Sequence, residues 1–190
     1  MQNTLTDDEE RALISALPDK VAFQTLYRAY FERVFGYIAY RVGRRQDAED
    51  ITADVFMRVL RKVHTFEYRG AGSFAAWIFQ IARNQVAQFY RYAERRPDSL
   101  IPLDDLPNMQ GNSLLPYEAL MKKETFARLH GAIDSLSERR QEVVTLRFYG
   151  GLSNQEIAHV LDLDERTVAS HLSRAIDDLQ RTYRAKESSL

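Results

Sequence analysis

The sequence predicts an all-α protein with two small helical domains joined by a flexible acidic linker, the second domain containing a helix-turn-helix. In both halves the apolar residues recur at steps of three and four, whereas the alternation typical of strands is weak. Between the halves, residues 97–116 hold four of the five prolines and no regular apolar period. A stretch of this length without structure is unusual inside one compact domain, so it favours two domains.

The predicted boundaries follow these shifts in composition. An acidic extension with a short helix occupies residues 1–18, and the first domain occupies residues 19–96. The linker spans 97–116, the second domain 117–183, and a tail covers 184–190.

The net charge of −1 is unevenly distributed along the chain. Residues 1–18 carry one arginine against four acids, and residues 19–96 carry 14 basic against 8 acidic side chains. Residues 97–120 carry four acids and no base, while residues 121–190 carry 11 of each. A basic first domain, an acidic linker and a neutral second domain indicate separate functions for the parts.

Composition also excludes several classes of protein. With no cysteine the chain has no disulfide, thiolate zinc site or cysteine nucleophile, which suits a reducing cytoplasm. The N-terminus is acidic and lacks the apolar run of a signal peptide. Because no apolar stretch approaches the roughly 20 residues of a membrane helix, we expect no membrane insertion.

The N-terminal half predicts four helices. Thr6 and Glu9 form a capping box for a short helix that ends before Pro18. A long apolar stripe starts at Val21 and stops at Gly43.

The third of these helices is expected over Asp47–His64, and Ser73 is expected to cap the fourth. The loop Thr65–Gly72 separates them. Trp77 lies near the core stripe of the fourth helix, which favours core packing over a contact with DNA.

The C-terminal half predicts a helix over Tyr117–His130 and a second helix over Glu138–Tyr149, capped by Ser137 and ended by two glycines. Two further helices follow. Ser153 and Glu156 form a capping box for the first of them, and Asp164 is expected to cap the second.

The spacing in this last pair of helices is typical of a helix-turn-helix. Ala158 is small where two helices must cross closely, Leu163 fills the turn, and Val168 anchors the second helix on the first. Asp162 stands at the turn position where glycine is usual, and aspartate tolerates the left-handed conformation better than most residues. The alternative is a pair of ordinary amphipathic helices with solvated outer faces.

In a helix-turn-helix the second helix enters the major groove by its N-terminal end. Its outward side chains here include donors for base edges and phosphates and one small apolar contact. The expected residues for DNA binding are Arg166, Thr167, Ala169, Ser170, His171, Ser173 and Arg174.

The chain resembles bacterial sigma factors of the extracytoplasmic-function class from about Phe23 to Tyr183, the linker excepted. FQTLYRAYFERVFGYIAYRVGRRQDAEDITADVFMRVLRKVHTF resembles regions 2.1 and 2.2, and FEYRGAGSFAAWIFQIARNQVAQFYR resembles regions 2.3 and 2.4. LSERRQEVVTLRFYGGLSNQEIAHVLDLDERTVASHLSRAIDDL resembles region 4. The resemblance implies a subunit that directs RNA polymerase core to promoters, with region 4 on the −35 element and region 2 on the −10 element.

By this resemblance, the helix over Asp47–His64 docks on the clamp helices of the polymerase β′ subunit. The residues that it implies are Asp47, Glu49, Asp50, Asp54, Phe56 and Arg58. Ala53 and Asp54 stand where the family often has Gln-Glu. The alternative is that these acids cap a helix N-terminus and form i,i+4 pairs with Arg58 and its neighbours.

The loop after that helix and the helix that follows resemble the part of the family that melts the −10 element and captures an extruded base. Aromatic side chains stack on single-stranded bases while cations follow the backbone, and Gly70 and Gly72 allow a loop to close around a base. The expected residues are Phe66, Tyr68, Arg69, Ser73, Arg83, Asn84 and Gln88.

The resemblance further implies as partners RNA polymerase core (β′ clamp helices and β flap), promoter DNA and an anti-sigma factor. We expect a cytoplasmic protein with no enzymatic activity, cofactor or metal site, because the four histidines have no metal-ligand spacing and no nucleotide-binding loop is present.

Two non-enzymatic alternatives remain open: a free-standing helix-turn-helix regulator with an N-terminal sensing domain, and an interaction protein that has lost DNA binding. A free regulator usually carries a basic DNA-binding domain, whereas residues 121–190 are neutral. This balance favours a subunit that a large partner holds on DNA.

Overall fold

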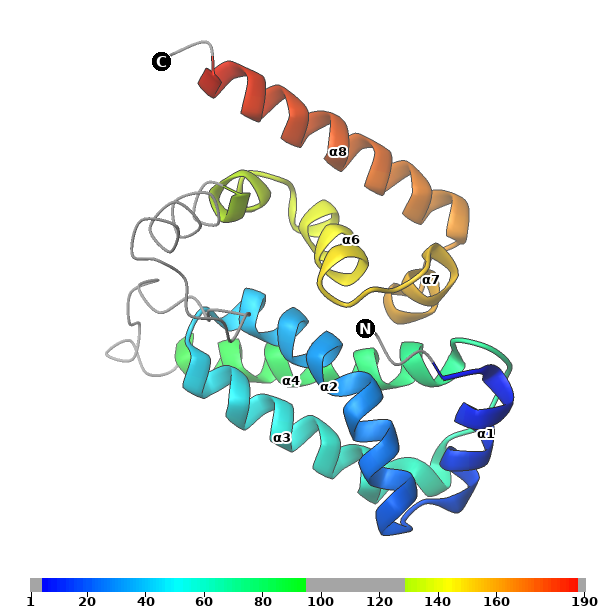
Figure 1. The fold of residues 1–190 in the computed structure, drawn as a ribbon. Coiled ribbons are helices and arrows are strands. Elements are labelled where there is room, and N and C mark those ends of the chain that lie inside the picture. The colour runs from blue at the N-terminus through cyan, green and yellow to red at the C-terminus, as the bar shows by residue number, and fades with distance from the viewer. Residues whose placement is uncertain (1–4, 95–128, 188–190) are drawn as a thin grey trace, which may run out of the picture.

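The computed structural model describes residues 5–94 and 129–187, and the ordered structure in both ranges is helical. Figure 1 shows one layer of N-terminal helices beneath a second layer of C-terminal helices, with α8 at the outer edge. The N-terminal layer contains α1 (Asp7–Ala16), α2 (Lys20–Val42), α3 (Arg45–Lys62), a 3-10 turn (Val63–Thr65) and α4 (Ser73–Glu94). The C-terminal layer contains α6 (Glu138–Phe148), α7 (Asn154–Leu161) and α8 (Glu165–Glu187).

Local capping chemistry sets the ends of the first two helices. The Thr6 hydroxyl accepts from the Glu9 amide, and the Glu9 carboxylate accepts from the Thr6 amide, so the capping box is confirmed. Asp19 caps α2 by accepting from the amides of Val21 and Ala22, each at 2.9 Å. The helix ends at Gly43, whose φ of 76° is in the region that favours glycine.

Two predicted helix starts are wrong by one or two residues. α3 begins at Arg45, before the expected Asp47, and its N-cap Arg44 makes no side-chain cap hydrogen bond. α4 includes Ser73 as its first residue, and the Ser73 hydroxyl accepts from the backbone amide of Arg69 instead of capping the helix. In both cases the chain enters the helix from a loop that the helical period alone does not locate.

The described part of the C-terminal layer starts with helical residues 129–134, which lie partly beyond the predicted helix end at His130. Ser137 is the N-cap of α6, as expected, but without a side-chain hydrogen bond. The earlier part of the helix predicted over Tyr117–His130 and the predicted linker lie outside the described residues.

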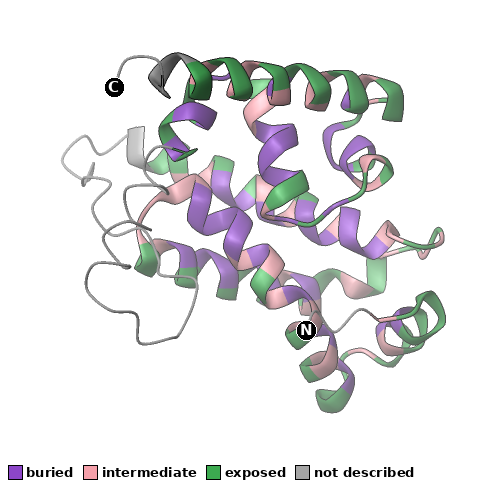
Figure 2. Ribbon diagram, turned by 45° about the horizontal axis from the view of Figure 1, so that its top comes forward, coloured by how far each residue is buried: buried purple, intermediate pink, exposed green. Residues whose placement is uncertain are grey.

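One continuous apolar core joins the two layers. α4 contacts α3 on one side and α7 on another, and α2 contacts α6. Figure 2 shows buried residues gathered where the layers face each other. The core includes side chains with 0% exposure from both layers: Val34, Tyr37 and Phe79 from the first, and Leu146, Leu152 and Ile157 from the second. The two helical domains are therefore packed together in this structure.

The tight turn between α6 and α7 packs closely against α4. A Cβ added at Gly150 would lie 2.8 Å from a ring carbon of Phe79 and 2.6 Å from the carbonyl oxygen of Leu146, so only glycine fits there. Arg33 of α2 donates to the carbonyl oxygen of Gly150 at 2.8 Å and to that of Gly151 at 3.3 Å. These bonds satisfy carbonyls that the end of a helix leaves free.

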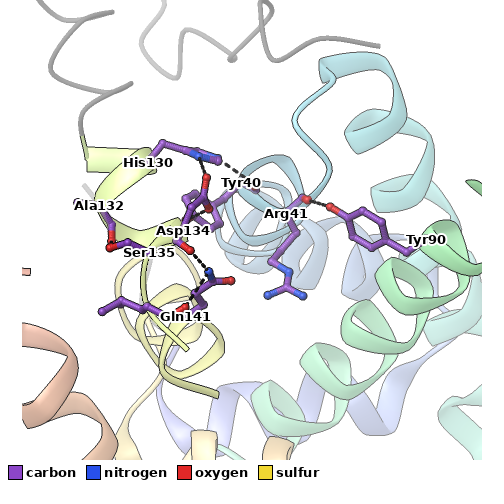
Figure 3. Close-up of polar contacts among 9 residues, drawn as sticks. Tyr40, Arg41, Tyr90, His130, Ala132, Asp134, Ser135 and Gln141 are labelled. Atoms are coloured by element: carbon purple, nitrogen blue, oxygen red, sulfur yellow. Dashed lines mark hydrogen bonds and ion pairs between the residues drawn. The ribbon is translucent and has the colours of Figure 1, made fainter. Parts of the chain in front are cut away.

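A second group of polar contacts between the layers lies near the C-terminal end of α2. His130 contacts the Asp134 carboxylate at 2.9 Å and the Tyr40 carbonyl oxygen at 3.4 Å, while the Tyr40 hydroxyl donates to Asp134 (Figure 3). The Tyr40 ring also stacks on Tyr149, with centroids 4.7 Å apart. Polar and aromatic contacts thus hold residues far apart in sequence at the edge of the apolar core.

A crosslinking measurement tests this packing directly, because the native chain has no cysteine to interfere. Gln80 of α4 donates to the carbonyl oxygen of His159 in α7 at 2.8 Å, and both residues are exposed. We expect the Q80C/H159C double variant of the full chain to crosslink efficiently with a short bismaleimide. The control pair is Q80C/S170C, because Ser170 lies on the exposed side of α8. Equal yields from the two pairs would contradict the packing.

Candidate nucleic-acid interface

The helix-turn-helix has the local geometry that the sequence predicts. The Ser153 hydroxyl accepts from the Glu156 amide at 3.2 Å, and the Glu156 carboxylate accepts from the Ser153 amide at 2.6 Å. Asp162 ends α7 with φ and ψ both at 54°, which is the left-handed conformation expected of the turn. The Leu163 amide then donates to the Ala158 carbonyl oxygen at 3.0 Å.

Asp164 sets the start of α8. Its carboxylate accepts from the Thr167 amide at 2.8 Å and from the Thr167 hydroxyl at 2.6 Å. These hydrogen bonds hold the pKa of the Asp164 carboxyl below its usual range. Val168 and Ala175 have 0% exposure, so α8 buries one face and presents the opposite face to solvent.

The outward face of α8 carries the residues predicted to bind the −35 element. Thr167 and His171 are half-buried, and the remaining members are exposed: Arg166, Ala169, Ser170, Ser173 and Arg174. The Thr167 hydroxyl already donates to Asp164, so it retains only acceptor capacity. Partial burial, assisted by nearby Arg139 and Arg140, lowers the pKa of His171, so this side chain is neutral near pH 7. The two exposed arginines therefore provide the positive charge among the predicted residues.

The conformation of Asp162 leads to a stability prediction. Non-glycine residues in the left-handed region cost about 1 kcal/mol, although aspartate tolerates it better than most. We expect Asp162→Gly to raise the free energy of unfolding by up to about 1 kcal/mol in a urea titration. Asp162→Ala is the matched control and should lower it. If glycine is no more stable than alanine at this position, the left-handed turn is wrong.

The loop predicted to capture a base has both of its glycines at positive φ, 102° at Gly70 and 78° at Gly72. The loop returns to α4 through the Ser73 amide, which donates to the Gly70 carbonyl oxygen at 3.1 Å. Phe66 packs against Trp77 at a centroid distance of 5.0 Å and against Phe74 at 5.5 Å. Trp77 is half-buried against the core, which agrees with the packing role expected of it.

Carboxylates contact three of the residues predicted to bind the single strand. The Tyr68 hydroxyl donates to Asp7 of α1, Arg69 pairs with Glu67, and Arg83 pairs with Glu142 of α6. Glu142 is itself buried, and it comes from the C-terminal layer. Asn84 is exposed and Gln88 is half-buried. The structure thus brings Phe66, Tyr68 and Arg69 together in one loop that ends at Ser73, the first residue of α4, and it places Arg83 at the contact between the layers.

The residues predicted to contact polymerase divide into two groups on α3. Glu49, Asp50 and Asp54 are exposed, and Asp47 and Arg58 are half-buried. Phe56 is only 4% exposed and packs on Tyr27 at a centroid distance of 4.6 Å, so its assignment to a binding surface is wrong.

The ion pairs of α3 also differ from the alternative in which its acids lie in the first turn and pair with Arg58 and its neighbours. Only Asp47 lies in the first turn, and the i,i+4 pair that forms joins Glu49 to Arg45 at 2.7 Å. Sequence reasoning missed Met57, which is 47% exposed beside these acids. The signal was available, because residue 57 lies off the stripe of Ile51, Val55 and Val59.

Metal-ligand clusters and membrane-spanning helices are both absent from residues 5–94 and 129–187. No group of three or more potential ligands is arranged to hold a metal ion in this part of the chain. Among the same residues, no helix combines the length and apolar character needed to cross a bilayer.

Comparison with known proteins matches both layers. The family model for sigma-70 region 2 matches residues 26–96, and that for sigma-70 region 4 matches residues 126–179. The chain is 36% identical over 160 residues to the ECF RNA polymerase sigma factor BldN of Streptomyces coelicolor, covering 84% of this chain and 60% of that protein. It is 30% identical over 185 residues to the RNA polymerase sigma-H factor of Pseudomonas aeruginosa, covering 93% and 95% respectively.

A solved structure shares the fold. The sigma factor RpoE in its complex with the anti-sigma factor NepR from Bartonella quintana aligns with a TM-score of 0.63 and 22% identity, covering 85% of this chain and 96% of that one. The helix-turn-helix and the matches to two sigma-70 regions define a DNA-binding transcription protein. With both sigma-70 regions present, the chain belongs to the extracytoplasmic-function class of RNA polymerase sigma factors, and it directs transcription initiation.

Proposed function

We propose that residues 19–96 bind polymerase core and open the −10 element, and that residues 117–183 fix the −35 element. The observation that carries this proposal is the exposed row on α8, where Arg166, Ser170 and Arg174 project from the N-terminal half of the second helix of the helix-turn-helix. Serine and arginine side chains at such positions donate to base edges and phosphates.

The −10 function rests on the basic N-terminal layer and its loop. Residues 19–96 carry the excess of Lys and Arg, and their loop combines aromatic rings with two glycines at positive φ. Single-strand binding needs this combination, because rings stack on bases while cations offset phosphate charge. Because Nε of Arg83 pairs with Glu142, a phosphate at Arg83 either competes with this carboxylate or binds the remaining N–H groups of the guanidinium.

The polymerase contact is assigned to the exposed acids of α3, Glu49, Asp50 and Asp54, with Met57 as an apolar contact at their side. The β′ clamp helices are the proposed partner of this surface, and the β flap is the proposed partner of the C-terminal domain. The protein works as a subunit without catalysis of its own, in the cytoplasm where polymerase is found. An anti-sigma factor is a further proposed partner, and RpoE of Bartonella quintana is bound to one.

A reconstitution measurement tests the proposed function. The purified chain should shift no promoter DNA at physiological salt, because residues 121–190 are neutral, and it should support run-off transcription once polymerase core is added. Promoters for this assay come from mapping the transcripts that appear on overexpression. Tight sequence-specific binding without core, together with no transcription, would instead identify a free-standing regulator.

Alanine at Arg166, Ser170 and Arg174 together should reduce transcription at least tenfold, because each lost base or phosphate contact removes about 1 kcal/mol or more. Alanine at the exposed Arg181, further along α8, is the control and should have little effect. Unchanged transcription by the triple variant would favour the interaction-only alternative.

The polymerase surface makes a separate prediction. The D50K/D54K double variant should weaken binding to core in fluorescence titrations, and the loss should shrink at high salt because exposed charges are screened. The control is D8K, which reverses an exposed acid of α1. Equal affinity of wild type and D50K/D54K for core would remove α3 from the interface.

A further inference from the structure

We infer that α1 is a positioning element for the promoter-opening loop, and that Asp7 and Arg11 hold the Tyr68 ring where an unpaired base stacks on it. This inference rests on the proposed function of region 2. It assigns a role to the acidic N-terminal helix, which precedes both segments that match the sigma-70 regions.

α1 is firmly docked on the N-terminal layer. Ile14 is 8% exposed, and the apolar side chains of Leu13 and Leu17 pack against the same core. Glu10 is also 8% exposed, and its carboxylate accepts a hydrogen bond from the hydroxyl of Tyr30 in α2. A buried carboxyl is costly unless it is hydrogen-bonded, so this contact fixes where α1 lies on α2.

One turn earlier, α1 reaches the loop. The Tyr68 hydroxyl donates to the Asp7 carboxylate and lies 3.4 Å from the Asp7 carbonyl oxygen. The guanidinium of Arg11 lies over the Tyr68 ring, 5.7 Å from its centroid. Partial desolvation and the Asp7 contact raise the pKa of the Tyr68 hydroxyl to about 12, so it remains a donor at physiological pH.

A chain of ring contacts returns from Tyr68 to α1. Tyr68 meets Phe66 edge-on at a centroid distance of 6.5 Å, and Phe66 meets Phe74 at 5.5 Å. Phe74 meets Tyr30 at 5.3 Å, and Tyr30 bonds to Glu10. The loop aromatics are therefore connected to α1 at both ends, through Asp7 and through Glu10.

This arrangement addresses a specific physical problem. Gly70 and Gly72 give the loop conformational freedom, and a mobile ring loses entropy when a base stacks on it. The contacts from Asp7 and Arg11 reduce that loss because they restrict the ring before DNA arrives. Tyr68 belongs to the binding surface, whereas Asp7 and Arg11 act through it.

The test uses the full chain assembled with polymerase core and a single-stranded −10 oligonucleotide from a mapped promoter. Asp7→Ala should weaken binding of this strand about three- to tenfold, the effect of losing one hydrogen bond of ordinary strength. Asp7→Asn should retain most of the affinity, because its amide oxygen also accepts from Tyr68. The matched control is Asp8→Ala, which removes the neighbouring exposed acid of the same turn.

A protein–base cycle separates positioning from a general loss of structure. Abasic sites are placed one at a time along the oligonucleotide. Removal of the base at one position should lower the affinity of the wild type, and it should lower the affinity of Tyr68→Ala much less. With Asp7→Ala the cost at that same position should also fall, while assembly with core and binding of −35 duplex should not change. A merely destabilised helix would reduce binding equally at every position.

Three results would overturn the inference. Stronger strand binding by Asp7→Ala would show that α1 masks the loop, and equal losses for Asp7→Ala and Asp8→Ala would show a non-specific charge effect. An unchanged abasic profile in Asp7→Ala would show that Asp7 does not position Tyr68. Failure of the wild-type holoenzyme to bind the strand or to transcribe would instead contradict the proposed function itself.

Discussion

The packing of the α6–α7 turn against α2 and α4 is the constraint on which the rest of the arrangement depends. Gly150 allows the turn to approach Phe79, and Arg33 bonds to the carbonyl oxygens that this turn exposes. With the turn fixed, α7 packs against α4 on one side and against α8 on the outer side (Figure 1). This contact therefore sets where the predicted −35 surface lies relative to the N-terminal layer.

This constraint has an electrostatic consequence. Arg83, a cation predicted to follow the DNA backbone, pairs with the buried Glu142 of the other layer. A buried carboxylate left without its partner is costly, and a second guanidinium, that of Arg139, lies 3.9 Å from Glu142. This ion pair therefore links a residue predicted to bind the strand to the contact between the two layers.

The features that the sequence predicted correctly are local. Both capping boxes and the left-handed turn at Asp162 depend on residues three or four positions apart, and a helical period needs no tertiary information. Phe56 was misassigned because one turn of helix offers both a buried and an exposed position, and the family resemblance does not distinguish them. The shared core was not predictable either. Phe79 and Ile157 each fit the core of their own domain, and periodicity does not show that they meet.

The Asp7–Tyr68 contact also lies beyond sequence reasoning, since 61 positions separate the two residues. The charge balance of the chain explains why such a contact matters. The C-terminal domain is neutral and offers two exposed arginines among its predicted contacts, so little affinity comes from phosphate neutralisation there. When a partner supplies the effective concentration, selectivity depends on how rigidly the reading side chains are held. Asp164 holds the start of α8 in this way through Thr167, and α1 holds Tyr68, so both candidate surfaces use a carboxylate to fix geometry.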